Sequence, residues 1–231
     1  MIDRLKWFIE KWCEVMLRPI LFFTRLKEES WQEEALTFLL ILSWLTAFLA
    51  TLVVFIISYV PVGQYMVAGI AGFKFIIILP VLIVLAFNFF AITFLILAGV
   101  FVCGFFVAQG LFAAILHYIA VNWQGKGSLN RMLQSMFYGS APYMAVNIVL
   151  LLVLFAKYTN LGFDLFSVGF NLIYYLTVLF IYGLWAIAIR KNYGLPKWKA
   201  FILALVPILG LLLFGILFDK IALSKFEPWV S

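Results

Sequence analysis

The hydrophobic residues of this chain gather in five long stretches, of which the last three are each bounded by a polar or basic turn. The stretches cover residues 35–59, 61–120, 141–156, 168–189 and 200–218. A helix needs about 18 consecutive apolar residues to cross a bilayer, and most of these stretches reach that length. The pattern predicts an all-α fold, a polytopic integral membrane bundle of about five transmembrane helices.

The second stretch, residues 61–120, is too long for a single crossing. About 60 residues at a rise of about 1.5 Å each would make a helix far longer than a bilayer is thick. Gly63, Gly69, Gly72 and Pro80 mark breaks in its first third. We therefore expect an interfacial or re-entrant helix over residues 66–80, followed by a long, tilted second span.

The first 34 residues carry a different pattern. Between residues 1 and 18, apolar side chains recur every three or four positions, which is typical of a helix lying on a membrane surface. Pro19 disfavours continuation of this helix, and a second short amphipathic piece is expected over residues 20–29. Ser30 and Glu33 have the spacing of a capping box at the start of the first span. The chain thus divides into an amphipathic cytoplasmic segment, residues 1–34, and a transmembrane domain, residues 35–231.

Composition indicates that the chain is a membrane protein, and the positions of its charges predict its orientation in the membrane. Apolar residues make up 67% of the chain, and the mean hydropathy is +1.15, more than a soluble domain can bury. A cytoplasmic N-terminus with one net crossing in residues 61–120 leaves four of the 16 basic residues outside: Lys74, Lys157, Lys220 and Lys225. The positive-inside rule therefore predicts a multi-pass protein with its N-terminus cytoplasmic and its C-terminus outside.

The loop Gly125-Lys126-Gly127-Ser128 has the residue types of a phosphate-binding loop. The Walker pattern, however, is Gly-x-x-x-x-Gly-Lys-Ser/Thr between a strand and a helix, whereas this loop joins two helices. We instead expect Gly125 and Gly127 to serve backbone geometry, with positive φ angles at the end of the second span. Ser128 is predicted to cap a short helix over residues 129–137.

Polar side chains within the apolar stretches are candidate functional residues. They are Asn88, Gln109, His117, Asn147 and Asn171. None carries a full charge, and a single histidine cannot build a histidine-based metal cluster within one chain. No catalytic motif is present, so we expect no catalytic, cofactor or metal site. Two interpretations stay open, hydrogen bonds between helices and the lining of a path for ions or lipids.

Three segments together carry a family resemblance: FFTRLKEESWQEEAL at 22–36, the loop between the second and third spans, and IRKNYGLPKWKAFILALVP at 189–207. They resemble the Yip family, small five-span membrane proteins named for interaction with Ypt and Rab GTPases, and in particular its prokaryotic branch. There the first loop reads Gly-Gly-Lys-Gly, followed by a short helix and a proline. The matching positions here are Gln124, Gly125, Lys126, Gly127, Tyr138, Gly139 and Pro142. The second loop matches at Arg190, Gly194, Leu195, Lys197, Lys199 and Ala200.

Two departures from the family pattern limit what the resemblance implies. Gln124 replaces the first glycine of the loop, and the acidic-Leu-Tyr-Gly-Pro segment of eukaryotic members is absent. The GTPase partners of eukaryotic members are therefore not transferred to this chain. What the resemblance implies is a non-enzymatic, five-span scaffold in a prokaryotic cytoplasmic membrane, with a cytoplasmic N-terminus and with Pro142 shaping the loop.

The leading functional hypothesis is an adaptor or membrane-organising scaffold that acts through a basic cytoplasmic face. The residues expected to contact anionic headgroups or a protein partner are Lys126, Arg131, Arg190, Lys191, Lys197 and Lys199. A basic residue beside a membrane attracts anionic lipid by about 1 kcal/mol. The alternative is a transporter or channel for ions or lipids. No nucleic-acid partner is expected. Gly99, Gly104 and Gly110 allow close helix approach, either within the chain or in a homo-oligomer.

Overall fold

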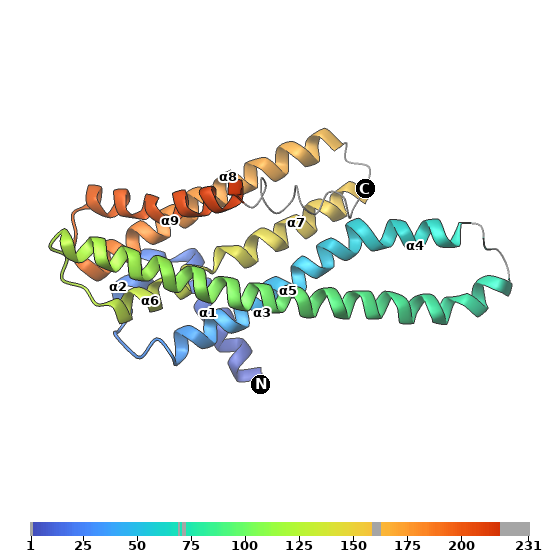
Figure 1. The fold of residues 1–231 in the computed structure, drawn as a ribbon, viewed down its shortest axis with the longest axis horizontal. Helices are drawn as coiled ribbons and strands as arrows, with labels where there is room; N and C mark the ends of the chain where they lie inside the picture. Colours follow the sequence, from blue (N-terminus) through green and yellow to red (C-terminus); the bar gives the residue numbers. More distant parts are fainter. Residues whose placement is uncertain (1, 69, 71–72, 159–162, 218–231) are drawn as a thin grey trace.

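The fold is a bundle of long helices lying side by side (Figure 1), seen in a computed structural model that describes residues 2–68, 70, 73–158 and 163–217. Every regular element in these residues is a helix. The long elements are α3 (Glu34–Val54), α5 (Phe73–Asn122), α7 (Pro142–Tyr158), α8 (Phe163–Tyr193) and α9 (Lys197–Leu217). The short elements are α1 (Ile2–Leu17), α2 (Pro19–Arg25), α4 (Val60–Val67) and α6 (Leu129–Tyr138).

The first predicted span extends beyond its expected end at residue 59. α3 passes through a π-helical segment, η1 (Phe55–Tyr59), directly into α4. Pro61 in the first turn of α4 has no N–H to donate and its ring crowds the preceding turn, which the wider π-helical turn accommodates. The Tyr59 hydroxyl lies 3.3 Å from Thr93 Oγ1 of α5, which ties this irregular segment to the neighbouring helix.

The predicted separate helix over residues 66–80 does not form in the described residues, because 66 and 67 end α4 and 73–80 begin α5; Gly69 and Gly72, two of the predicted breaks, lie outside the described residues. α5 runs without a break for 50 residues, and Pro80 lies inside it. At about 1.5 Å per residue this helix is about 75 Å long. A break here would leave backbone N–H and C=O groups unpaired among apolar side chains, whereas a continuous helix pairs nearly all of them internally. The long apolar run therefore overrides the helix-breaking tendency of Pro80.

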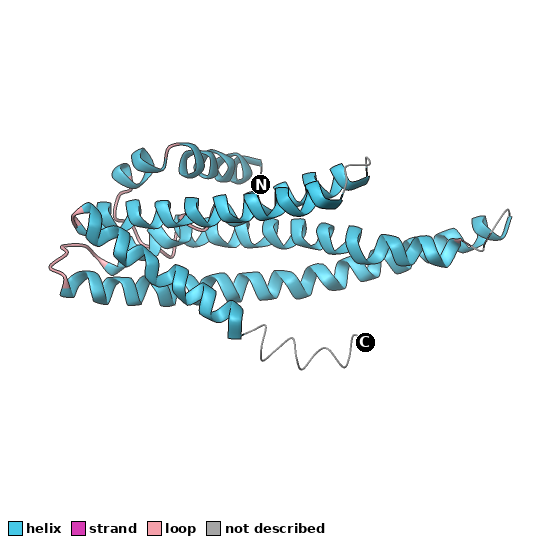
Figure 2. Ribbon diagram, turned by 90° about the horizontal axis from the view of Figure 1, so that it is seen from above, coloured by secondary structure: helices cyan, strands magenta, loops and turns pink. Residues whose placement is uncertain are grey.

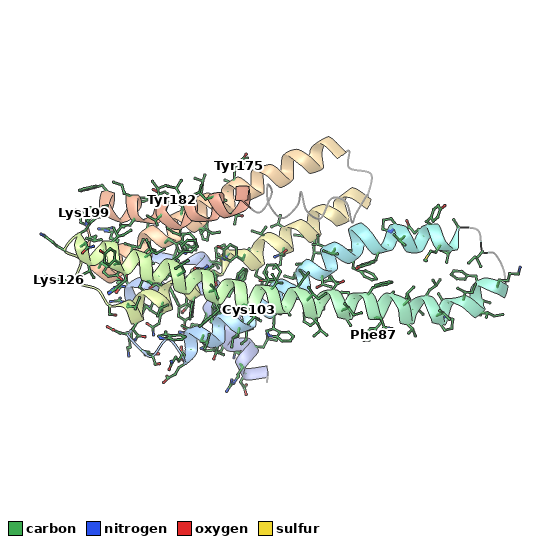
Figure 3. All side chains as sticks on the ribbon, viewed as in Figure 1. Phe87, Cys103, Lys126, Tyr175, Tyr182 and Lys199 are labelled. Carbon is green, nitrogen blue, oxygen red and sulfur yellow. The ribbon has the colours of Figure 1, made fainter. Side chains whose placement is uncertain are left out.

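α4 and the first half of α5 form an antiparallel hairpin that projects beyond α7 and α8 (Figures 1 and 2). Its surface is apolar, with Ile76, Ile83 and Val84 each at least 60% exposed. Phe87, labelled in Figure 3, is 69% exposed. We call residues 60–67 together with residues 73–90 the projecting hairpin.

Helices form where the third, fourth and fifth spans are predicted. α7, α8 and α9 cover these stretches within the described residues. Two helices in the described part of the chain are long and apolar enough to cross a membrane, Glu34–Val54 and Lys74–Asn122. The number of crossings, five, stays a prediction.

The N-terminal helices pack on one side of the bundle (Figure 2). α1 matches the helix predicted over residues 1–18, but its apolar stripe is divided between two environments. Phe8 and Val15 are fully buried against the bundle, whereas Leu5 and Ile9 are about half exposed (48% and 50%). α1 therefore does not rest on a membrane surface alone, because it shares a hydrophobic core with α3.

Two expectations for the segment before α3 are wrong. α2 ends at Arg25 rather than near residue 29, and Ser30 with Glu33 forms no capping box. Glu33 precedes α3 without a side-chain cap, and its N–H donates to Ser30 O at 3.2 Å. Tertiary contacts prevail here, because the Asn130 and Gln134 amides of α6 both donate to Glu29 O at 2.6 Å.

Two hydrophobic clusters hold the bundle together at its loop end. One surrounds the fully buried Trp185 and joins α5, α6, α8 and α9. The other surrounds Phe38 and joins the N-terminal helices to α3, α6 and α8. Both clusters lie where the connections between α5 and α6 and between α8 and α9 gather (Figure 1). The loop end is therefore the packed part of the molecule.

Candidate functional site

The loop that joins α5 to α6 is bonded to the end of α8. The Lys126 N–H donates to Tyr193 O at 3.1 Å, and Asn192 Nδ2 donates to Ser128 O at 3.0 Å. Asn192 and Tyr193 are both buried. These contacts join the first loop to the second, so the two form one surface rather than two independent segments.

The glycines of this loop are required for space, and not for positive φ as expected. A Cβ on Gly127 would lie 2.5 Å from Tyr193 Cδ1 and 2.7 Å from Asn192 O. One on Gly125 would lie 2.8 Å from Ala120 O. Contacts this short force neighbouring atoms to move, and two of them involve backbone oxygens, which yield least.

The left-handed conformations occur at Gln124 and Gly194, both with φ of 66°. Gln124 ends α5 in a Schellman motif, in which the Gly125 N–H donates to Ala120 O at 2.9 Å and the Gln124 N–H to Val121 O at 2.9 Å. Gly194 ends α8 in the simpler left-handed motif, donating to Arg190 O at 3.0 Å. Both turns therefore satisfy carbonyl groups at helix ends.

Ser128 is the N-cap of α6, as predicted. Its backbone is extended, and its Oγ accepts the Arg131 N–H at 3.2 Å. Burial of the other face of α6, including Met132 and Met136, inserts this short helix into the bundle rather than leaving it on the surface. The cap thus sets the direction in which the chain enters the packed core.

His117, one of the predicted intramembrane polar residues, belongs to this loop assembly. Its Nδ1 lies 2.7 Å from the Tyr193 hydroxyl. Burial raises the pKa of Tyr193 well above its usual range, so that its hydroxyl stays protonated. His117 therefore fastens α5 to the end of α8 and has a structural partner.

The predicted basic residues divide into two groups. Lys126, Lys197 and Arg190 are exposed at the loop end, and Lys191 is half-buried in the last turn of α8. Lys199 Nζ lies 5.9 Å from the Trp123 ring and 5.7 Å from the Trp198 ring, a geometry that suits cation–π attraction. Lys126 and Lys199 are seen together at this end in Figure 3. We call these five residues, Lys126, Arg190, Lys191, Lys197 and Lys199, the basic end.

Arg131 is set apart from the basic end by its contacts. Its Nη2 donates to Phe23 O at 3.4 Å, in the last turn of α2. A cation at this position also complements the negative end of the helix dipole. Arg131 therefore holds the N-terminal segment in place.

A polar groove lies between the N-terminal helices and the starts of α3 and α6, and sequence reasoning missed it. Its volume is about 500 Å³, and charges of both signs line it: Lys11, Glu14, Arg18, Arg25, Lys27, Glu29 and Glu34. Buried Gln134 and Tyr138 also line the groove. Burial, with added repulsion from Glu34 and Glu29, keeps the pKa of Tyr138 well above its usual range. No local motif predicts the groove, because it forms only when α2 folds back on α6.

A second cavity lies within the bundle, and it brings two of the predicted intramembrane polar residues together. Gln109 of α5 and Asn147 of α7 line it, with Thr46 of α3 and Tyr143 of α7; its volume is about 420 Å³. Asn147 Nδ2 donates to Tyr143 O, one turn earlier in α7, at 3.1 Å. Gln109 Oε1 and Thr46 Oγ1 are buried and have no hydrogen-bond partner among the described residues.

Asn88, another of the predicted intramembrane polar residues, does not line this cavity. Asn88 lies on an exposed face of α5, and its Nδ2 donates to Val84 O at 2.9 Å in its own helix. Asn88 is 21 residues from Gln109, or about 30 Å along the helix axis. The Asn171 side chain lies outside the described residues. Thr46 and Tyr143 were not predicted as residues of a polar site. One signal could have pointed to Thr46, because Ser43 and Thr46 are three residues apart and so lie on one face of α3.

Two observations bear on the other expected sites. In the part of the chain that the structure describes, no group of three or more His, Cys, Asp or Glu residues could hold a metal ion. A Cβ added at Gly99, Gly104 or Gly110 would meet nothing within 4 Å among the described residues. Among the described residues these glycines therefore make no close helix contact, and the contact between copies stays a prediction.

Comparison with known proteins places the chain in a family. The Yip1 domain matches residues 13–218, which include the α5–α6 loop, the end of α8 and the helices that pack around them. Neither the search of curated proteins nor the search of solved structures found a match. With a match over most of its length and long apolar helices, the chain is a membrane protein that belongs to the Yip1 domain family.

Proposed function

We propose that this Yip1 domain protein is a non-enzymatic adaptor or membrane-organising scaffold that acts through its basic end. The observation that carries the proposal is the bond between the two loops, from the Lys126 N–H to Tyr193 O at 3.1 Å. It holds Lys126 on the same rigid surface as the basic residues of α8 and α9. A fixed cluster of cations beside a membrane attracts anionic headgroups or an acidic protein partner.

The proposal includes five crossings with the N-terminus and the basic end in the cytoplasm. Support comes from the charge distribution, since Lys74 is in the first turn of α5, at the opposite end of the bundle from Lys126. The N-terminal helices and the loops of the basic end share the other end of the bundle. Positive charge concentrated at one end is what the positive-inside rule associates with the cytoplasmic side.

A lipid-enrichment measurement tests the proposal. The protein is reconstituted in nanodiscs of mixed phosphatidylglycerol and phosphatidylcholine, released into the gas phase, and the lipids retained on it are counted by native mass spectrometry. Wild-type protein should retain an excess of phosphatidylglycerol over the composition of the disc. The triple charge reversal Lys126→Glu, Lys197→Glu and Lys199→Glu should remove that excess.

The matched control is Lys74→Glu, the same substitution at the far end of the bundle. It should leave the excess of phosphatidylglycerol unchanged. An excess that survives the triple reversal, or that falls equally with Lys74→Glu, would contradict headgroup binding by the basic end.

A transporter or channel is the second candidate, and the cavity between Gln109 and Asn147 favours it. Against a continuous path, Asn88 lies about 30 Å from Gln109 along α5 and faces outward. Tracer-flux and lipid-scrambling assays in liposomes separate the two functions. Flux above that of empty liposomes, abolished by Asn147→Leu, would support transport and overturn the scaffold.

A further inference from the structure

The cavity within the bundle has the features of a binding site for a small amphiphile. Its volume, about 420 Å³, falls in the range of small-molecule sites, roughly 300–1,000 Å³. Its lining is mostly apolar, including Phe101, Phe105, Phe112 and Ile181, and its polar residues are few. Small-molecule sites are typically built this way, from an apolar wall and a few placed polar groups.

Two residues that line this cavity each carry a buried polar atom without a hydrogen-bond partner among the described residues. Gln109 is 2% exposed and Thr46 is 1% exposed, yet Gln109 Oε1 and Thr46 Oγ1 accept and donate no hydrogen bond. A buried polar group without a partner is unfavourable, because it has lost its hydrogen bonds to water. Thr51, one turn further along α3, shows the usual solution, since its Oγ1 donates to Ala47 O at 2.8 Å. Gln109 Oε1 and Thr46 Oγ1 therefore each have an unused hydrogen bond, which a ligand in the cavity could supply.

The chemistry of the lining restricts the ligand. None of the described residues that line the cavity is a lysine, arginine, aspartate or glutamate, so a charged headgroup would lack a counter-charge among them. A hydroxyl group both donates and accepts, so it can pair with the Gln109 amide in either orientation of that side chain and with Thr46 Oγ1. The apolar wall suits a hydrocarbon body.

The position of the cavity indicates how a ligand would reach it. Gln109 is 13 residues from the end of α5, which is about 20 Å from the loop end along the helix. The cavity thus lies at the depth of the apolar helices, and Phe101, Phe105 and Val146 in its lining are only half-buried. A lipid dissolved in the bilayer could therefore enter from the side.

We infer that this cavity binds one neutral lipid whose head is a free hydroxyl, with the hydroxyl on Gln109 and Thr46 and the hydrocarbon against Phe101, Phe105 and Phe112. The chemistry is shared by single-chain lipid alcohols and by diacylglycerol. Retained water alone is the competing occupant, although water needs two to four polar partners and the cavity wall is largely apolar.

Photolabelling of the full-length protein in phosphatidylcholine nanodiscs tests the inference. The probe is hexadecanol carrying a diazirine in its chain, and the adducts are located by mass spectrometry. Labelling should be saturable and should fall on peptides of α3, α5 and α7 that line the cavity. Unlabelled hexadecanol should compete about tenfold better than hexadecane, which is the value of one net hydrogen bond. Dioleoylglycerol as a second competitor distinguishes the two lipid sources.

Matched variants show whether the polar atoms carry the preference. Gln109→Leu should make hexadecanol and hexadecane compete equally, whereas Asn88→Leu, the same substitution on the same helix outside the cavity, should not. Thr46→Val keeps the shape of the side chain and should weaken the preference, whereas Thr51→Val should leave it intact. These two valine variants keep the test decisive if Gln109→Leu fails to fold.

Three results would overturn the inference. One is labelling that does not saturate or that falls outside the lining helices, as expected of a cavity that holds only water. Another is equal competition by hexadecanol and hexadecane in the wild-type protein. The last is a preference for the alcohol that persists in both Gln109→Leu and Thr46→Val.

Discussion

Gln124 adopts a backbone conformation that is unfavourable for a residue with a side chain. With φ of 66° it occupies the left-handed region at the end of α5, where a side chain other than glycine costs about 1–2 kcal/mol. Glycine occupies this position in the family pattern that the loop resembles. We expect Gln124→Gly to raise the free energy of unfolding by about 1 kcal/mol, measured by denaturant unfolding in detergent.

Gln124→Ala is the control for that prediction, since alanine keeps the Cβ that is disfavoured at positive φ. It should show no gain. A loss of stability in Gln124→Gly would mean that the glutamine side chain contributes more than the strain it imposes.

Gly127 is required because a side chain would not fit beside Tyr193 and Asn192, and not because of its φ angle. Gly127→Ala puts a methyl group against Tyr193 and Asn192, and overpacking of this kind costs about 1–3 kcal/mol. The midpoint of thermal unfolding should fall. Gly110→Ala is the comparison, because nothing lies within 4 Å of its added Cβ and alanine favours a helix interior. Equal midpoints for the two variants would show that the loop yields to Tyr193.

The position of the projecting hairpin relative to the membrane can be tested directly. It extends past α7 and α8, yet its surface consists of residues such as Ile83 and Val84. Water contact over so much apolar surface is strongly unfavourable, at about 25 cal/mol per Å². We therefore expect the hairpin to tilt so that it stays within the hydrocarbon, as overlong apolar helices do.

Thiol accessibility measures that tilt. In a background of Cys13→Ser and Cys103→Ser, a cysteine at Val84 should resist a membrane-impermeant maleimide in intact proteoliposomes and react once detergent is added. A cysteine at Lys74, at the tip, is the control and should react before detergent. Reaction of the Val84 cysteine as fast as the Lys74 cysteine would show that the hairpin stands in water.

At the scale of elements, the sequence predicts most of the helices and few of their breaks. Hydrophobic runs locate α3, α7, α8 and α9, and the three-to-four spacing of apolar residues locates α1. Pro80 misleads, because the local rule for proline gives way to the backbone pairing that an apolar environment demands. The box at Ser30 and Glu33 misleads for a different reason, since Asn130 and Gln134 of α6 hold Glu29 from about 100 residues away.

The sequence likewise predicts only part of the candidate site. The sequence predicts that the two loops share a surface, because charge and short connections place them at one end. It does not predict the role of Asn192 and Tyr193, because these residues act through hydrogen bonds to a loop that is distant along the chain. It identifies Gln109 and Asn147 as polar residues in apolar helices but cannot show that they share a cavity that excludes Asn88.

For the whole molecule, the central claim is that the basic end forms a single cytoplasmic surface on a five-span bundle. Lys126 lies in the α5–α6 loop, which bonds to Tyr193 and Asn192 at the end of α8, and Lys197 begins α9 directly after the next turn. Lys74 lies at the other end of the bundle. This arrangement requires an odd number of crossings between Lys74 and Lys126, with Lys74 outside, and an even number between Lys126 and Lys197, with both inside. The claim therefore fails if any one of these residues is on the wrong side.

The most direct measurement is maleimide labelling of single cysteines at Lys126, Lys197 and Lys74, in vesicles of known orientation and in the background without Cys13 and Cys103. The account predicts that the cysteines at 126 and 197 react with an impermeant maleimide only in inside-out vesicles. The cysteine at 74 should react only in right-side-out vesicles. Labelling of 126 and 74 from the same side, or of 126 and 197 from opposite sides, would contradict it.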